Sequence, residues 1–105
     1  MIINDENFKK EVLEKKGIQI VVDFWAKWCM PCLALSPILE GVIKDFKGRF
    51  ILIKVNVDKI PKISEKYKII SIPNVKMFKN GKIVNEFVGV KTEEFIRRWL
   101  NKNLK

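Results

Sequence analysis

The 105-residue sequence contains no histidine and only two cysteines. Without histidine, the chain has no imidazole for acid–base catalysis and cannot form a zinc site of mixed cysteine and histidine ligands. Both cysteines lie in one tetrapeptide, Cys29-Met30-Pro31-Cys32. Because a bridge within so short a loop constrains the unfolded chain only weakly, the pair is better placed for chemistry than for stabilising the fold.

Glycine (5) and proline (4) are also sparse, which excludes collagen-like and low-complexity chains. No apolar run approaches the roughly 18 residues that a membrane-spanning helix needs, because Asp23 interrupts the longest stretch, Ile20 to Trp25. Asp5 and Glu6 do not fit the basic start and apolar core of a signal peptide. We therefore expect one soluble cytoplasmic domain, residues 1–105, that does not attach to a membrane.

The net charge of +9 is concentrated in the second half of the chain. Residues 1–53 include 8 basic and 7 acidic residues, whereas residues 54–105 include 13 and 5. A positive electrostatic field attracts negatively charged partners, including nucleic acids. However, there is no Arg-rich run, and Lys76, Lys79 and Lys82 are spaced along an apparent hairpin. This spacing favours a solvated lysine-rich surface over nucleic-acid binding.

Apolar periodicity and turn residues predict alternating helices and strands. Asn4 can cap a first helix that Gly17 ends, Pro37 should kink the second helix, and Asn80-Gly81 is typical of a tight hairpin. Strands separated by helices require right-handed parallel crossovers, so we expect a mixed α/β sheet with helices on both faces. The expected elements are a helix at 4–17, a strand Ile18 to Trp25, a helix Pro31 to Phe46, a strand Phe50 to Val57, a short helix Pro61 to Tyr67, strands Asn74 to Lys79 and Lys82 to Val88, and a helix after Thr92, with Met1 to Asn4 as a candidate leading strand.

Cys29 follows a predicted buried strand and precedes a predicted helix. Unpaired N–H groups and the helix dipole favour an anion there, which lowers the pKa of a thiol and supplies a thiolate nucleophile. Pro31 has no N–H, so the amide of Cys32 is the expected donor to the Cys29 sulfur. Cys32 lies one helical turn further on and faces the core. We predict that Cys29 attacks a target disulfide and that Cys32 resolves the mixed disulfide.

Asp23 is an acid within an apolar strand. Burial would disfavour its charged form and raise its pKa. Buried acids are uncommon, so the residue alone favours a place at a strand end, open to water.

The stretch Val22 to Cys32, VDFWAKWCMPC, resembles the active-site segment of the thioredoxin family. The resemblance covers almost the whole chain, and its motifs in this order are highly specific. It implies a thioredoxin fold, with a mixed five-stranded sheet flanked by four helices, in a monomeric protein-disulfide reductase recharged by a thioredoxin reductase. The further matching motifs are Pro37-Ile38-Leu39-Glu40, Lys54 to Asp58, Ile72-Pro73, Phe78 to Gly81, and Val88-Gly89.

The same resemblance implies roles for individual residues. Asp23 would act as general base toward Cys32, with Lys54 beside it as a partly offsetting charge. The Ile72–Pro73 bond would be cis and face Cys29, and the Ile72 backbone would pair with an extended substrate segment. No cofactor and no metal are implied. The expected substrate-binding residues are Trp28, Met30, Pro31, Ile72, Pro73 and Gly89.

Met30 stands where the family usually has glycine, and Leu33 where it usually has a basic residue. These departures leave the mechanism intact but affect the reduction potential and the range of partners. A thiol oxidant or isomerase of the same fold is the alternative. It is disfavoured because no export signal is visible and the cytosol is reducing. A zinc module is also disfavoured, since Cys29 and Cys32 supply only half of the four ligands.

Overall fold

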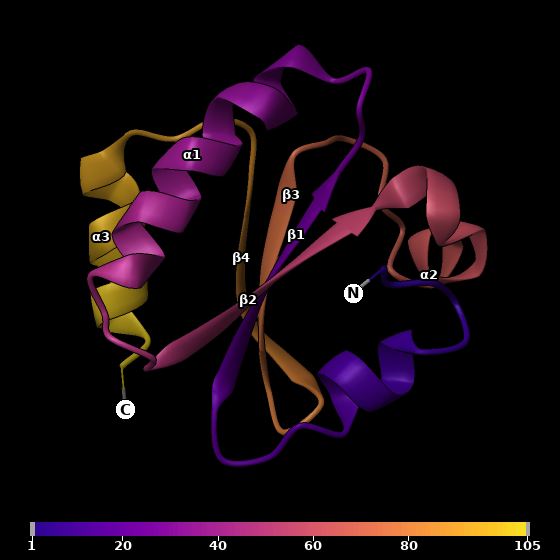
Figure 1. Cartoon of the computed structure of the whole chain (residues 1–105), viewed down its shortest axis with the longest axis horizontal. Helices are drawn as coiled ribbons and strands as arrows, with labels where there is room; N and C mark the ends of the chain where they lie inside the picture. Colours follow the sequence, from indigo (N-terminus) through magenta and orange to yellow (C-terminus); the bar gives the residue numbers. More distant parts are fainter. Residues whose placement is uncertain (1, 105) are drawn as a thin grey trace.

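Four strands form one mixed sheet in a computed structural model that describes residues 2–104. The strands are β1 (Gln19–Trp25), β2 (Phe50–Asn56), β3 (Asn74–Lys79) and β4 (Lys82–Val88), and their order in the sheet is β2-β1-β3-β4. The pair β1 and β2 is parallel, while β3 is antiparallel to both β1 and β4 (Figure 1). The central position of β1 agrees with its β-branched, nearly continuous apolar sequence, which is typical of a strand buried on both faces.

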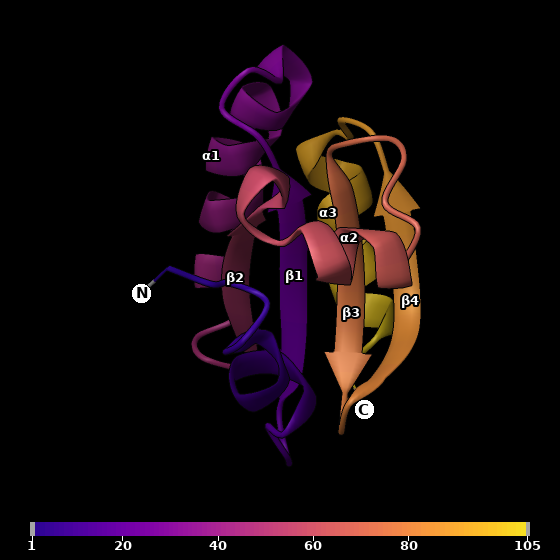
Figure 2. The ribbon, with the colours of Figure 1, turned by 90° about the vertical axis from the view of Figure 1, so that its right-hand side faces the viewer.

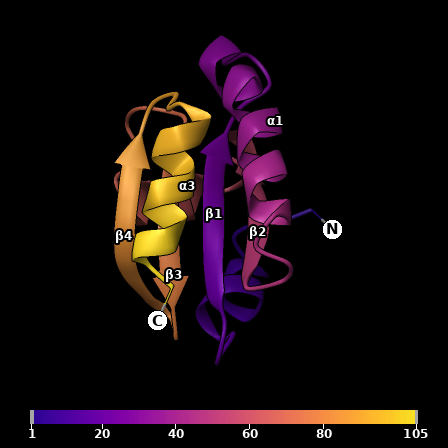
Figure 3. The same cartoon turned by 90° about the vertical axis from the view of Figure 1, so that its left-hand side faces the viewer.

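Helices cover both faces of the sheet. One face carries α1 (Met30–Lys44) and α3 (Glu93–Lys102), which stand side by side in Figure 3. The other face carries η1 (Lys9–Leu13) and α2 (Pro61–Lys66), which lie in front of the sheet in Figure 2. A short turn, η2 (Val57–Lys59), joins β2 to α2.

Alternation along β1 divides the core into two apolar clusters, because successive strand residues point to opposite faces. Val21 packs with Leu35 and Leu39 of α1 on the α1/α3 face. Val22 and Phe24 belong to the cluster on the opposite face, where η1 and α2 lie. Asp23 shares its face with Val21, so the alternation directs this carboxyl toward α1 and α3.

The predicted order of helices and strands is confirmed. The first helix, expected over 4–17, is shorter: η1 ends at Leu13, before Gly17. Two further details are wrong. The expected fifth strand is absent from residues 2–104, because Ile2, Ile3 and Asn4 form no strand; Met1 lies outside the described residues. Lys76 is not a solvated hairpin lysine. It is 5% exposed, and its ammonium group contacts the Glu86 carboxylate of β4 at 2.5 Å, which satisfies the charge that the sheet buries.

None of the helices in the described part of the chain is long and apolar enough to cross a bilayer.

The turn between β3 and β4 packs against the end of η1. Asn80 and Gly81 both have positive φ, at 51° and 83°, as a two-residue hairpin turn of the favoured type requires. The Gly17 N–H donates to the Asn80 side-chain oxygen at 3.2 Å. A Cβ atom at Gly81 would lie only 2.8 Å from the Leu13 carbonyl oxygen. Glycine is therefore required here both by the backbone angle and by the neighbouring chain.

We expect Gly81→Ala to destabilise the protein more than Gly48→Ala. Both glycines have a φ of +83°, so alanine incurs a similar left-handed penalty of about 1 kcal/mol at each. Only at Gly81 does the new Cβ meet backbone, since nothing lies within 4 Å of a Cβ at Gly48. Urea unfolding of the two variants measures the difference. Equal losses would show that the Leu13 contact is relieved without cost.

Candidate active site

The loop between β1 and α1 places Cys29 at the start of a helix. Cys29 is the residue before α1, with an extended backbone (φ −97°, ψ 104°), and its Sγ accepts the N–H of Cys32 at 3.2 Å. Pro31 lies in the first turn, where a missing N–H costs nothing. The predicted donor to the Cys29 sulfur is therefore confirmed. A negative charge that develops on this sulfur is stabilised by the Cys32 amide and by the helix dipole.

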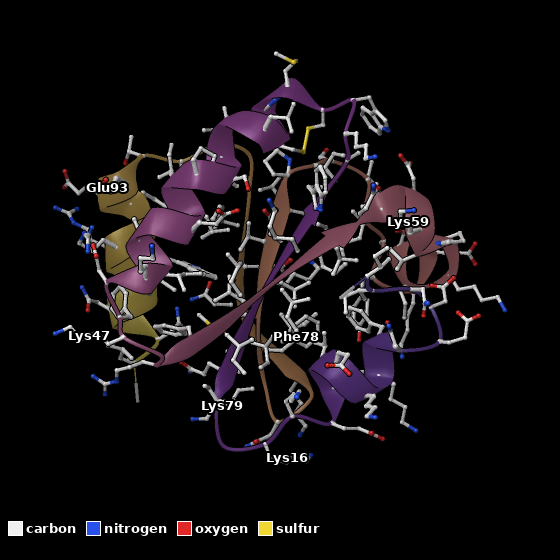
Figure 4. All side chains as sticks on the ribbon, viewed as in Figure 1. Lys16, Lys47, Lys59, Phe78, Lys79 and Glu93 are labelled. Carbon is white, nitrogen blue, oxygen red and sulfur yellow. A yellow bond between two sulfur atoms is a disulfide. The ribbon has the colours of Figure 1, made fainter. Side chains whose placement is uncertain are left out.

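Cys29 and Cys32 form a disulfide, with their Cα atoms 5.3 Å apart. Figure 4 shows its yellow bond at the N-terminal end of α1. Cys29 is 5% exposed and Cys32 1%, so Cys29 is the more exposed of the two residues. Ala26 completes the buried cluster around the two sulfurs, with Trp25, Val57 and Ile72 packed against it.

Segments distant in sequence bring Ile72, Pro73 and Gly89 to the disulfide. The Ile72–Pro73 bond is cis, as the family resemblance implied. The Ile72 carbonyl oxygen lies 3.8 Å from the Cys29 sulfur. Gly89 donates its N–H to the Pro73 carbonyl at 2.8 Å, which holds the end of β4 beside this bond. Of the predicted substrate-binding residues, Ile72 thus contacts Cys29, while Pro73 follows it in the chain and Gly89 is bonded to Pro73.

The rim of the site is apolar and exposed. Trp28 is 68% exposed, Met30 74% and Leu33 46%. The indole N–H of Trp28 donates to a carboxylate oxygen of Asp58, in η2, at 3.1 Å. This bond orients an otherwise exposed ring. Asp58 belongs to a matching family motif in the sequence but has no predicted role, because only the fold brings the end of β2 next to the loop after β1.

Asp23 is fully enclosed in the sheet. Its exposed fraction is 1%, and neither carboxyl oxygen has a hydrogen-bond partner. The expectation from the residue alone, a strand-end aspartate open to water, is wrong; the raised pKa is supported. The pKa of Asp23 is raised to about 6, mainly by desolvation; the positive charge of Lys54 offsets part of this increase, and the negative charge of Glu40 adds to it.

Lys54 lies opposite Asp23 in the register of β1 and β2. Its ammonium group does not pair with Asp23. It donates to the Ser36 hydroxyl and to the Glu40 carboxylate, the latter at 3.1 Å. It also lies 5.2 Å from the centroid of the Trp25 ring. The positive charge expected beside Asp23 is therefore present, but its hydrogen bonds go to Ser36 and Glu40 of α1.

Ser36 has no predicted role, and Glu40 is predicted only as part of a family motif. They lie four residues apart on α1, and the Ser36 hydroxyl donates to Glu40 at 2.9 Å. The hydrogen bond from Ser36, followed by that from Lys54, lowers the pKa of Glu40. The signal in the sequence was the spacing of four, which puts two side chains on one face of a helix. Nothing in the sequence indicated that Lys54 of β2 contacts this face of α1.

Among residues 2–104, no group of three or more His, Cys, Asp or Glu side chains is arranged to hold a metal ion.

Comparison with known proteins agrees with this geometry. The thioredoxin family model matches residues 1–102. The chain is 40% identical to a thioredoxin of Rickettsia felis over 102 residues, which cover 97% of this chain and 96% of that protein. It is 41% identical to a thioredoxin of Buchnera aphidicola over 103 residues (98% and 94%), and 38% identical to one of Chlorobaculum thiosulfatiphilum over 100 residues (95% and 92%).

We expect Asp23→Asn to stabilise the protein at pH 8 and to lose this advantage near pH 4. A folded-state pKa of about 6 against 3.8 means that the folded state binds the proton more tightly. Stability from this group therefore falls as pH rises from about 4 to above 6, by about 3 kcal/mol. Denaturant unfolding at several pH values measures it. Glu65→Gln, at an exposed residue without an ion pair in the described chain, is the control. A stabilisation independent of pH would contradict the prediction.

We expect Glu40→Gln and Lys54→Gln to shift the pKa of Asp23 in opposite directions. Removing the charge of Glu40 removes a repulsive carboxylate and leaves Lys54 without its ion-pair partner, so the pKa of Asp23 should fall. Removing the charge of Lys54 should raise it. NMR titration of the Asp23 carboxyl carbon in the oxidised protein measures both. Shifts of the same sign would show that the two charges do not act on Asp23 separately.

Proposed function

The chain belongs to the thioredoxin family of disulfide reductases, and on that premise we propose how its residues divide the reduction of a protein disulfide. Cys29 is the attacking nucleophile and Cys32 the resolving thiol. The observation that carries the assignment is the N–H of Cys32 donating to the Cys29 sulfur at the start of α1. In the reduced protein this arrangement stabilises a thiolate on Cys29, the more exposed of the two.

The exchange proceeds in two balanced steps. The Cys29 thiolate attacks one sulfur of the target disulfide, forms a mixed disulfide, and releases the other target sulfur as a thiolate. Cys32, deprotonated, then attacks the Cys29 sulfur. The Cys29–Cys32 disulfide forms, the second target sulfur leaves as a thiolate, and two electrons have passed to the target.

Asp23 is proposed as the base that takes the proton of Cys32. Its raised pKa, about 6, gives it a stronger affinity for a proton than an exposed carboxylate has, as general-base catalysis near neutral pH requires. Lys54 limits that increase, because its positive charge favours the ionised carboxylate. Asp23 and Lys54 are thus assigned opposite influences on one proton transfer.

Substrate recognition is assigned to the surface around Cys29. The exposed rings and chains of Trp28, Met30 and Pro31 offer an apolar contact. The Ile72 backbone would pair with an extended target segment, and Pro73 beside it carries neither charge nor N–H. Gly89 leaves the floor of this surface without a side chain.

The proposed setting is the cytoplasm, with residues 1–105 acting as one monomeric thioredoxin domain. Thioredoxin reductase is the proposed source of electrons, and disulfide-containing proteins are the proposed substrates. The relatives named as thioredoxins, matched over nearly their full length, support this setting. Neither a membrane nor a nucleic acid is part of the proposal.

We expect Cys29→Ser and Cys32→Ser to fail in different ways. With dithiothreitol as reductant, Cys29→Ser should not reduce insulin, because it lacks the attacking sulfur. Cys32→Ser, reduced and then freed of dithiothreitol before insulin is added, should form a mixed disulfide with insulin and accumulate it, because no thiol is left to resolve it. Turbidity measures turnover, and non-reducing electrophoresis measures the adduct. Each variant is the matched control for the other. An adduct that forms with Cys29→Ser would reverse the assignment.

A further inference from the structure

A recess beside the disulfide is lined by three lysines. It has a volume of about 350 Å³ and lies at the end of β2, where Lys27, Lys54 and Lys59 line it together with Trp25, Asn56 and the apolar side chains of Ile2 and Ile3. We call the three lysines, with Trp25 and Asn56, the basic recess. Figure 4 labels Lys59 at the turn that leads from β2 into α2. The proposed function makes no use of Lys27, Lys59 or Asn56.

Trp25 connects the recess to the reacting sulfurs. It lines the recess and also packs against the cluster that holds Cys29 and Cys32. Lys27 lies two residues before Cys29 in the same loop. Trp25 is therefore shared by the basic recess and by the cluster that holds the two sulfurs, which places the recess next to the surface that a target disulfide contacts.

The charges of the recess are only partly neutralised. Lys54 is paired with Glu40 at 3.1 Å. Lys27 and Lys59 are exposed and form no ion pair within residues 2–104. The carboxylate of Asp58, next to Lys59 in the chain, accepts the Trp28 indole N–H and keeps its negative charge, so it offsets one of the positive charges near the recess. Two ammonium groups beside the active disulfide thus remain available to an external anion.

We propose that the basic recess binds a carboxylate of the disulfide substrate, so that the protein prefers targets with Asp or Glu close to the disulfide. The occupant is a carboxylate because two ammonium groups attract an anion. The net charge of +9 attracts anions at longer range as well. The inference rests on the proposed function, since it names the class of target that the dithiol reduces.

The test uses two synthetic peptide disulfides that differ only in Glu or Gln at the residues flanking the cystine. The rate at which each oxidises the reduced protein is measured at low ionic strength and at about 1 M salt, where the Debye length is about 3 Å. We expect the Glu peptide to react about 5-fold faster at low salt, as two exposed charge contacts imply. The preference should disappear at high salt.

Two double variants separate the recess from the overall charge. Lys27→Gln/Lys59→Gln should lose the preference for the Glu peptide. Lys16→Gln/Lys79→Gln removes the same charge at the end of the molecule away from the disulfide, where Figure 4 labels both lysines, and should keep the preference.

Equal rates for the two peptides with the unaltered protein, or equal loss of preference in both double variants, would overturn the inference while the proposed function stands. Failure of the unaltered protein to reduce either peptide would overturn the proposed function, and this inference with it.

Discussion

The hydrogen bond from the Cys32 amide to the Cys29 sulfur is the contact on which the site depends. It exists because β1 ends at Trp25, the following loop turns, and α1 begins with Cys29 as its cap. Pro31 contributes by having no N–H of its own, so the first helical amide in reach of the sulfur is that of Cys32. The order strand, loop, cysteine, helix is thus sufficient to create a local preference for negative charge.

A second constraint acts behind the sulfurs, within the sheet. Asp23 has no hydrogen-bond partner, so its protonation is governed by desolvation and by distant charges. A carboxylate that accepted several hydrogen bonds would have a lower pKa. The pKa of Asp23 is instead set by the balance between burial, which raises it, and the charge of Lys54, which lowers it. Because Glu40 and Ser36 bind the ammonium group of Lys54, α1 takes part in this balance from the same face that carries Cys32. Helix α1 therefore carries Cys32, the proposed proton donor, and also influences the pKa of Asp23, the proposed acceptor.

Much of this arrangement could be read from the sequence, since the relevant signals are local. Strand β1 and the start of α1 follow from apolar runs and from the proline after Cys29, and the raised pKa of Asp23 follows from burial.

The sequence does not predict contacts between side chains that the fold alone brings together. The Trp28–Asp58 bond and the Lys54 contacts to α1 join positions 14 to 30 residues apart. Lys76 was misjudged for the same reason, because its partner Glu86 lies on the next strand. The fifth strand was implied by resemblance alone, and no apolar pattern in the leading residues required it.

The surroundings of Cys29 combine two kinds of surface with different ranges of action. The apolar rim of Trp28, Met30 and Leu33 acts only on contact and accepts many side chains, because the hydrophobic effect has no direction. Charges act over about a Debye length and have a sign. Leu33 occupies a position that is usually basic in the family, so the rim on α1 is apolar. Trp28 extends this rim to Asp58 in η2, next to Lys59, so the apolar rim and the basic recess adjoin. A target with both an apolar residue and a carboxylate near its disulfide would contact both surfaces at once. Selection by charge and retention by apolar contact are then properties of two adjoining surfaces beside one disulfide.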